Sequence, residues 1–80
     1  MRIVLSKTGL NYLAKLEKPT RSKIVTAIEG LPDMGDIKKM RGPGSPSLFR
    51  LRVGRYRVLY IWEDDVIRIV DIDTRGDIYK

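Results

Sequence analysis

The 80-residue chain carries a net charge of +6, with 16 lysine and arginine residues against 10 aspartate and glutamate residues. It contains neither histidine nor cysteine, which excludes disulfide bonds, thiolate zinc sites, thiol nucleophiles and the side chain that most often acts as a general base near neutral pH. We therefore expect one small domain with an anionic partner and with no metal or cofactor.

The sequence contains no recognisable signal peptide or membrane span. Its first apolar run, residues 3–5, is far shorter than the roughly 18 apolar residues that mark a transmembrane helix. We expect a cytoplasmic protein without a membrane partner.

Residues 2–5 have the pattern of a short strand, and a helix follows. Ser6 or Thr8 is predicted to cap that helix, because a side-chain oxygen at its start accepts a hydrogen bond from a free backbone N–H. Three leucines at three-residue spacing are predicted to form its buried stripe: Leu10, Leu13 and Leu16.

A second helix is predicted after Pro19, which disfavours helical geometry in the residue before it. Thr20 is its predicted cap. Its apolar residues fall at positions i, i+3, i+4 and i+7 and predict one buried stripe: Ile24, Ala27, Ile28 and Leu31. The two helices should form a hairpin.

Residues 30–47 are rich in glycine and proline and predict a long connection, with a short strand or turn at "DIKKM". Strands are predicted at 48–53, 56–63 and 66–73, joined by tight turns at Gly54-Arg55 and at Asp64-Asp65. The predicted fold is α+β: a single domain, residues 1–80, with an N-terminal strand and a helical hairpin packed on an antiparallel sheet of three to four strands.

Positive charge is concentrated in the middle of the chain. The segment from Lys38 to Arg57 holds seven basic residues and no acidic one. Residues two apart on a strand share a face, and a two-residue turn pairs Arg52 with Arg57, so Arg50 should join them in one cluster. Such a cluster suits a phosphate. The alternative is a solvated or salt-bridged face, with Asp71 or Asp73 as partners.

Apolar residues flank this cluster. Tyr56, Tyr60 and Trp62 alternate on one strand face, where they either pack in the core or stack on bases. A further apolar patch beside the arginines is predicted from four residues: Leu59, Ile61, Val70 and Ile72. A patch that is both apolar and basic would suit an acidic, amphipathic segment that folds on binding.

The segments "GDIKKMRG" and "LFRLRVGRYRVLYIWEDDVIRIVDIDTRGDIYK" resemble the RelE/ParE superfamily of toxins from prokaryotic toxin–antitoxin modules. The resemblance covers nearly the whole chain and implies the same α+β fold. It implies a metal-independent mRNA endoribonuclease that enters the A site of the 70S ribosome and inhibits translation. In RelE-like members the ribose 2′-hydroxyl attacks the adjacent phosphate. The expected protein partner is an acidic cognate antitoxin, through which alone the toxin would contact operator DNA.

The resemblance also implies site residues. The catalytic set would be Arg50, Arg52, Arg57, Arg75 and Tyr79, and the further RNA-binding residues Lys38, Lys39, Arg41 and Arg55. The two strand positions 50 and 52 are often lysine in RelE-like enzymes, and an arginine there cannot act as a general base.

Two other functions remain open at this stage. ParE-like members share the fold and poison DNA gyrase instead of cutting RNA. A non-catalytic module, either an inactivated toxin or an operator co-repressor acting with its antitoxin, would use the same basic face for docking.

Overall fold

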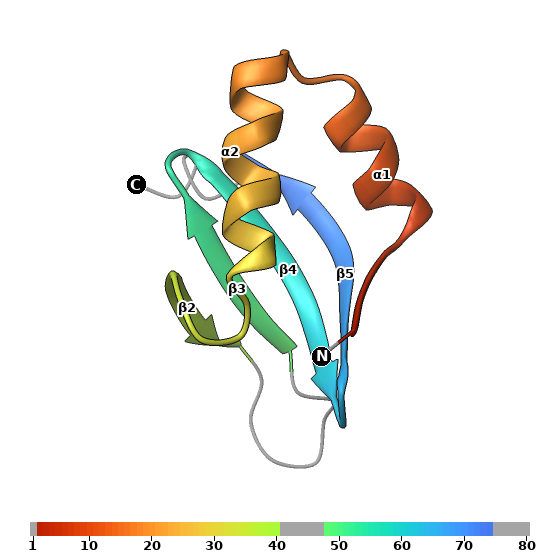
Figure 1. The fold of residues 1–80 in the computed structure, drawn as a ribbon, viewed down its shortest axis with the longest axis vertical. Coiled ribbons are helices and arrows are strands. Elements are labelled where there is room, and N and C mark those ends of the chain that lie inside the picture. The colour runs from red at the N-terminus through yellow and green to blue at the C-terminus, as the bar shows by residue number, and fades with distance from the viewer. Residues whose placement is uncertain (1, 41–47, 75–80) are drawn as a thin grey trace.

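The computed structural model describes residues 2–40 and 48–74, in which two helices cover one face of a five-stranded sheet (Figure 1). The elements follow one another along the chain as β1 (Arg2–Leu5), α1 (Lys7–Ala14), α2 (Lys18–Glu29), β2 (Asp36–Lys39), β3 (Leu48–Val53), β4 (Tyr56–Glu63) and β5 (Val66–Asp73). The predicted α+β class with a helical hairpin is confirmed. Among these residues no helix is long and apolar enough to cross a membrane.

The strand order is β1-β5-β4-β3-β2, and every neighbouring pair is antiparallel except β1 with β5, which is parallel. The predicted sheet of three to four antiparallel strands is therefore wrong in strand number and in the direction of β1. The contacts that place β1 join residues far apart in the sequence: the Ser6 hydroxyl donates to the carbonyl of Val70 at 3.1 Å, 64 residues away. A local sequence pattern cannot predict a contact between residues so far apart.

The first helix begins as predicted. Ser6 is its N-cap, and its hydroxyl oxygen accepts a hydrogen bond from the N–H of Gly9 at 3.1 Å. Leu13 is buried and Leu16 packs half-buried against the core, but Leu10 is 54% exposed, so the predicted stripe is wrong at Leu10. A helix has 3.6 residues per turn, and a strict three-residue spacing therefore drifts around its surface.

The second helix starts two residues before the predicted cap. It begins at Lys18 with Pro19 in its first turn and Glu17 as N-cap, so Thr20 lies inside the helix. Proline is tolerated there because the first N–H groups of a helix have no intrahelical partner to lose. The predicted stripe is confirmed: Ile24 and Ile28 are buried, as is Leu31 just after the helix.

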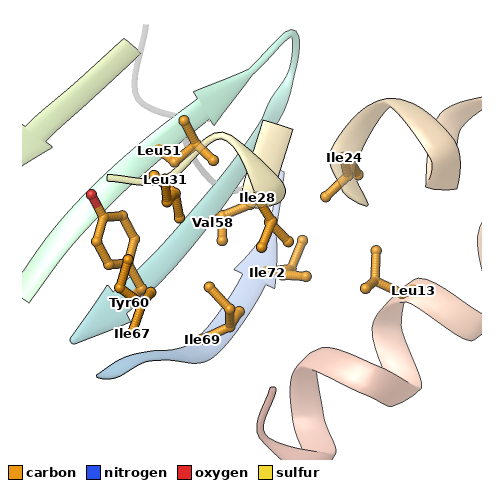
Figure 2. Close-up of a cluster of buried hydrophobic side chains, with 10 residues drawn as sticks. All are labelled: Leu13, Ile24, Ile28, Leu31, Leu51, Val58, Tyr60, Ile67, Ile69 and Ile72. Atoms are coloured by element: carbon orange, nitrogen blue, oxygen red, sulfur yellow. The ribbon is translucent and has the colours of Figure 1, made fainter. Parts of the chain in front are cut away.

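The core lies between the helices and the sheet, with α1 over β5 and α2 over β3 (Figures 1 and 2). Its buried side chains are Leu13, Ile24, Ile28, Leu31, Leu51, Val58, Tyr60, Ile67, Ile69 and Ile72. Both helices pack on the same face of the sheet, and within residues 2–40 and 48–74 no helix covers the other face (Figure 1).

Candidate functional site

The hairpin of β3 and β4 sets the positions of the arginines. Gly54 has a φ of +60°, a left-handed value that glycine adopts without steric cost, and it opens a tight turn between the strands. The resulting register pairs Val53 with Tyr56 and Arg52 with Arg57, as predicted from the sequence. Because cross-strand partners point to the same side, Arg52 and Arg57 are neighbours on the sheet.

The neighbouring strand β2 adds a further cation. It pairs Lys38 with Arg50 and Asp36 with Arg52. Since residue 51 of β3 is buried under the helices, residues 50 and 52 lie on the opposite side. We call this side of β2, β3 and β4 the arginine face and define it by four residues: Lys38, Arg50, Arg52 and Arg57.

A β-bulge in β5 brings a carboxylate to the arginine face. Leu59 pairs with Asp71, but the next residue of β4, Tyr60, pairs with Ile69, which leaves Val70 as the extra residue. Beyond the bulge the alternation of β5 is shifted by one. Asp73 therefore pairs with Arg57 on the arginine face, and Ile72 turns into the core.

The bulge overturns one sequence prediction. Ile72 was expected beside the arginines in an exposed apolar patch, but it is only 1% exposed and packs under the helices. The expectation assumed unbroken alternation along β5. The other members of that patch, Leu59, Ile61 and Val70, are half-buried.

Two ion pairs hold the arginines. Nη2 of Arg50 lies 3.3 Å from Oδ1 of Asp36, and Nε of Arg57 lies 3.7 Å from Oδ1 of Asp73. The second pair is the more enclosed: the Asp36 side chain is 63% exposed, but those of Arg57 and Asp73 are only 21% and 17% exposed. The predicted alternative of a salt bridge with Asp73 is therefore partly confirmed. The pairing of Arg50 with Asp36 was not predicted, because the register of β2 depends on the long connection between the helices and β3.

A ligand would reach Arg50 and Arg57 through their terminal nitrogens, since the two side chains are 18% and 21% exposed. Their Nε atoms are buried and have no hydrogen-bond partner within the described parts of the chain. Arg52 is exposed beside them. Like charges placed directly across a sheet repel one another, and an anion bound between them would relieve that repulsion.

Two other predicted RNA-binding residues, Lys39 and Arg55, do not lie on this face. Lys39 pairs with Phe49 and so belongs to the opposite side of the sheet from Lys38. Arg55 lines a groove of about 460 Å³ between α2 and the β3–β4 turn, together with Thr20, Lys23, Ile24, Val53, Gly54 and Tyr56. Arg41, Arg75 and Tyr79 lie outside the described residues.

The strand aromatics are on the helix side. Tyr60 is fully buried and stacks on Phe49 with ring centroids 5.4 Å apart, and Trp62 packs half-buried on Phe49 at 5.9 Å. Tyr56 meets Tyr12 of α1 edge to face at 6.4 Å. Of the two predicted roles, core packing is confirmed for these aromatics.

The pKa of Tyr12 is raised in part by two carboxylates near the end of β5. Burial raises the pKa of this phenol, and the charges of Tyr56, Asp73 and Asp71 raise it further, while a hydrogen bond with the Thr74 side chain acts in the opposite direction. Tyr12 therefore stays protonated at neutral pH on the helix side of Asp73.

Known proteins share this fold over nearly the whole chain. The chain superposes on the RelE–RelB complex of Pyrococcus horikoshii with a TM-score of 0.76 and 29% identity, covering 94% of both chains. The RelB–RelE antitoxin–toxin complex of Methanococcus jannaschii gives 0.74 and 28%, over 95% of this chain and 94% of that one. The isolated E. coli RelE toxin, at 21% identity and a TM-score of 0.64 over 98% of this chain and 89% of that one, is similar in fold.

Sequence comparisons agree. RelE1 of Methanocaldococcus jannaschii is 40% identical over 47 residues, which cover 56% of this chain, and the chain spans about half the length of that curated relative. These similarities define a toxin of the RelE/ParE superfamily. Residues 3–79 match the family described as the ParE toxin of the type II toxin–antitoxin system parDE, and the chain belongs to this family.

Proposed function

We propose that this toxin is a ribosome-dependent endoribonuclease that cuts messenger RNA by attack of a ribose 2′-hydroxyl on the adjacent phosphate. The observation that carries the proposal is the pairing of Arg52 with Arg57 beside Arg50 and Lys38 on the open face of the sheet. Guanidinium groups are planar, permanently charged donors, and a cluster of them binds phosphate oxygens in pairs.

The proposed division of labour follows from the exposure of each arginine. Arg57, fixed at its Nε edge by Asp73, would present its terminal nitrogens to the scissile phosphate. Arg52, exposed across the strand pair, would stabilise the charge that develops on the phosphorane. Arg50 and Lys38 would hold the neighbouring phosphate. Arg75 and Tyr79 remain proposed catalytic residues on the resemblance alone.

The reaction needs no metal in this proposal, because arginines supply the charge that a metal would otherwise supply to a phosphoryl oxygen. The protein would act in the cytoplasm at the ribosomal A site. An acidic antitoxin is the proposed partner, since the neighbouring RelE structures are complexes with RelB and the net charge here is +6. Operator DNA would be contacted through that antitoxin.

Purified toxin, released from its antitoxin, should cut mRNA on programmed ribosomes and leave a 2′,3′-cyclic phosphate and a 5′-hydroxyl. Arg57→Ala should lower kcat about 100-fold or more, as does removal of one donor to a developing oxyanion. Arg21→Ala is the matched control, because Arg21 lies on α2, which covers the other side of the sheet from the arginine face. Cleavage that survives in Arg57→Ala, or that requires a divalent metal, would argue against the proposal.

A second candidate is inhibition of DNA gyrase, which the description of the matching family as a parDE toxin favours. That activity would leave mRNA intact and would block supercoiling of plasmid DNA by purified gyrase. A supercoiling assay with the same wild-type and Arg57→Ala proteins separates the two candidates: inhibition of gyrase without cleavage of ribosome-bound mRNA would favour the second.

A further inference from the structure

The proposed reaction needs a group that removes the proton of the 2′-hydroxyl, and the arginines cannot provide it. An arginine keeps its proton at any pH at which the protein is folded. The sequence contains no histidine, and the two strand positions where RelE-like enzymes often carry lysine are Arg50 and Arg52. The carboxylates that the fold places beside these arginines are candidates for this base.

Asp73 is the carboxylate that the fold delivers to Arg57. The bulge at Val70 turns Asp73 to the arginine face, where it pairs with Arg57 across β4 and β5. Its Oδ1 lies 3.7 Å from Nε of Arg57, and its side chain is 17% exposed. A phosphate held by the terminal nitrogens of Arg57 would bring the adjacent ribose within reach of this carboxylate.

The bulge itself is held in place by the N-terminal part of the chain. The Ser6 hydroxyl donates to the carbonyl of Val70 at 3.1 Å, and the Ser6 N–H donates to the carbonyl of Ile69 at 2.9 Å. The bulged backbone is thereby bonded to the cap of α1, and the orientation of Asp73 is fixed by contacts outside β5. Bulges that redirect a side chain in this way are frequent beside active sites.

The other carboxylates near the face are less suited to the role. Oδ1 of Asp71 accepts a hydrogen bond from the N–H of Ile72 at 2.8 Å, and Asp71 pairs with Leu59 instead of with an arginine. Asp36 is 63% exposed beside Arg50, one strand further from Arg57. Among the described residues, Arg57 on β4 forms an ion pair with Asp73, and Tyr12 on α1 lies close enough to be affected by its charge.

We propose that Asp73 is the general base of the RNA cleavage, an inference that rests on the proposed ribonuclease function. Its carboxylate takes the proton of the 2′-hydroxyl, and the oxygen lone pair so released forms the new bond to phosphorus. The bond between phosphorus and the 5′-oxygen breaks, and its electron pair leaves with that oxygen. The leaving oxygen takes a proton from water, and the Asp73 carboxyl returns its proton to the solvent, so that protons balance over the cycle.

The deciding variant is Asp73→Asn, assayed for single-turnover cleavage of mRNA on programmed ribosomes. An asparagine keeps the size of the side chain and an oxygen that can face Arg57, but it cannot take up a proton. We expect kcat to fall about 100-fold to 10,000-fold, the range for loss of a general base, with KM changed less than about threefold. A residue that merely positioned Arg57 would tolerate the amide, so near-normal kcat in Asp73→Asn overturns the inference.

Matched controls keep the result specific. Asp71→Asn and Asp64→Asn remove the same charge and should each change kcat less than about threefold, because Asp71 pairs with Leu59 and Asp64 lies exposed in the turn between β4 and β5. Asp73→Glu retains a carboxylate and should be more active than Asp73→Asn; the reverse order would contradict the base. Thermal unfolding of each variant checks that it is folded. If Asp73→Asn is unfolded, Asp73→Ser is assayed in its place, and near-normal kcat in that variant overturns the inference.

The same assay separates this inference from the function on which it rests. If wild-type protein cuts mRNA, Arg57→Ala does not, and Asp73→Asn still does, then the ribonuclease stands and the base is some other group. If wild-type protein with normal antitoxin binding leaves ribosome-bound mRNA intact, the proposed function fails and the inference fails with it.

Discussion

At the scale of single residues, Tyr60 combines a well-packed ring with an unpaired polar group. Its ring is fully buried and stacked on Phe49, yet its hydroxyl has no hydrogen-bond partner among the described residues. A buried hydroxyl without a partner costs about 1–3 kcal/mol of desolvation. The position is therefore built for an aromatic ring, and its oxygen reduces the stability of the fold.

Tyr60→Phe should raise the free energy of unfolding by about 1 kcal/mol at neutral pH, because it removes the unpaired hydroxyl and keeps the stacked ring. Urea denaturation measures this difference. Tyr56→Phe is the matched control, since Tyr56 is half-buried and its hydroxyl is not among the buried atoms without a partner. A loss of stability in Tyr60→Phe would show that the hydroxyl is bonded in the folded protein.

The same residue makes a prediction for alkaline pH. Burial raises the pKa of Tyr60 above its ordinary value of 10.0, so the folded state holds the phenolic proton more tightly than the unfolded state. The free energy of unfolding is therefore unaffected by this ionisation below about pH 10 and falls as the pH rises through the folded pKa. Wild-type protein should lose stability more steeply than Tyr60→Phe above pH 10, and equal slopes would contradict the assignment.

At the scale of elements, the predictable features are the local ones. The register of Arg52 with Arg57 follows from a two-residue turn at Gly54, and the buried stripe of α2 follows from apolar spacing along one short segment. The bulge at Val70 follows from neither, because its carbonyl is bonded to Ser6 at the other end of the chain. Asp73 could be named from the sequence as a salt-bridge partner, but its place on the arginine face depends on that bulge.

The two glycines with positive φ give a matched pair of substitutions. Gly35, just before β2, has a φ of +117°, and an added Cβ would lie 2.6 Å from Cδ1 of the buried Leu51, whereas Gly54 has a φ of +60° and nothing within 4 Å. Gly54→Ala should cost about 1–2 kcal/mol of backbone strain. Gly35→Ala should cost more, because about 1–3 kcal/mol of overpacking is added. Urea denaturation that ranks them in the opposite order would contradict the packing of β2 on β3.

At the scale of the whole molecule, the two faces of the sheet have different roles. One face packs the core under α1 and α2, and the other carries Lys38, Arg50, Arg52 and Arg57 with Asp36 and Asp73 among them. The pairing of β1 beside β5 was missed from the sequence because it depends on contacts between the two ends of the described chain. The clustering of Arg50, Arg52 and Arg57 could be predicted, because all three lie in one hairpin whose side chains alternate between the two faces.

If RNA binds this face, its affinity should depend on salt in proportion to the phosphates contacted. For single-stranded RNA each contact contributes about −0.7 to the slope of log K against log salt concentration. Arg52→Ala should make that slope shallower by about 0.7, and Arg21→Ala, on the helix side of the sheet, should leave it unchanged. Fluorescence anisotropy with a short labelled RNA at several salt concentrations measures both slopes; an equal change in the two variants would point to non-specific attraction.

The central claim, that the arginine face cuts messenger RNA, is tested most directly by mapping mRNA 5′ ends after a short pulse of expression, with wild-type, Arg57→Ala and Arg21→Ala proteins side by side. Antitoxin binding by each variant serves as the check on folding. We predict new 5′ ends within codons for wild type and for Arg21→Ala, and their loss in Arg57→Ala. Growth arrest with intact mRNA, or cuts that persist unchanged in Arg57→Ala, would contradict it.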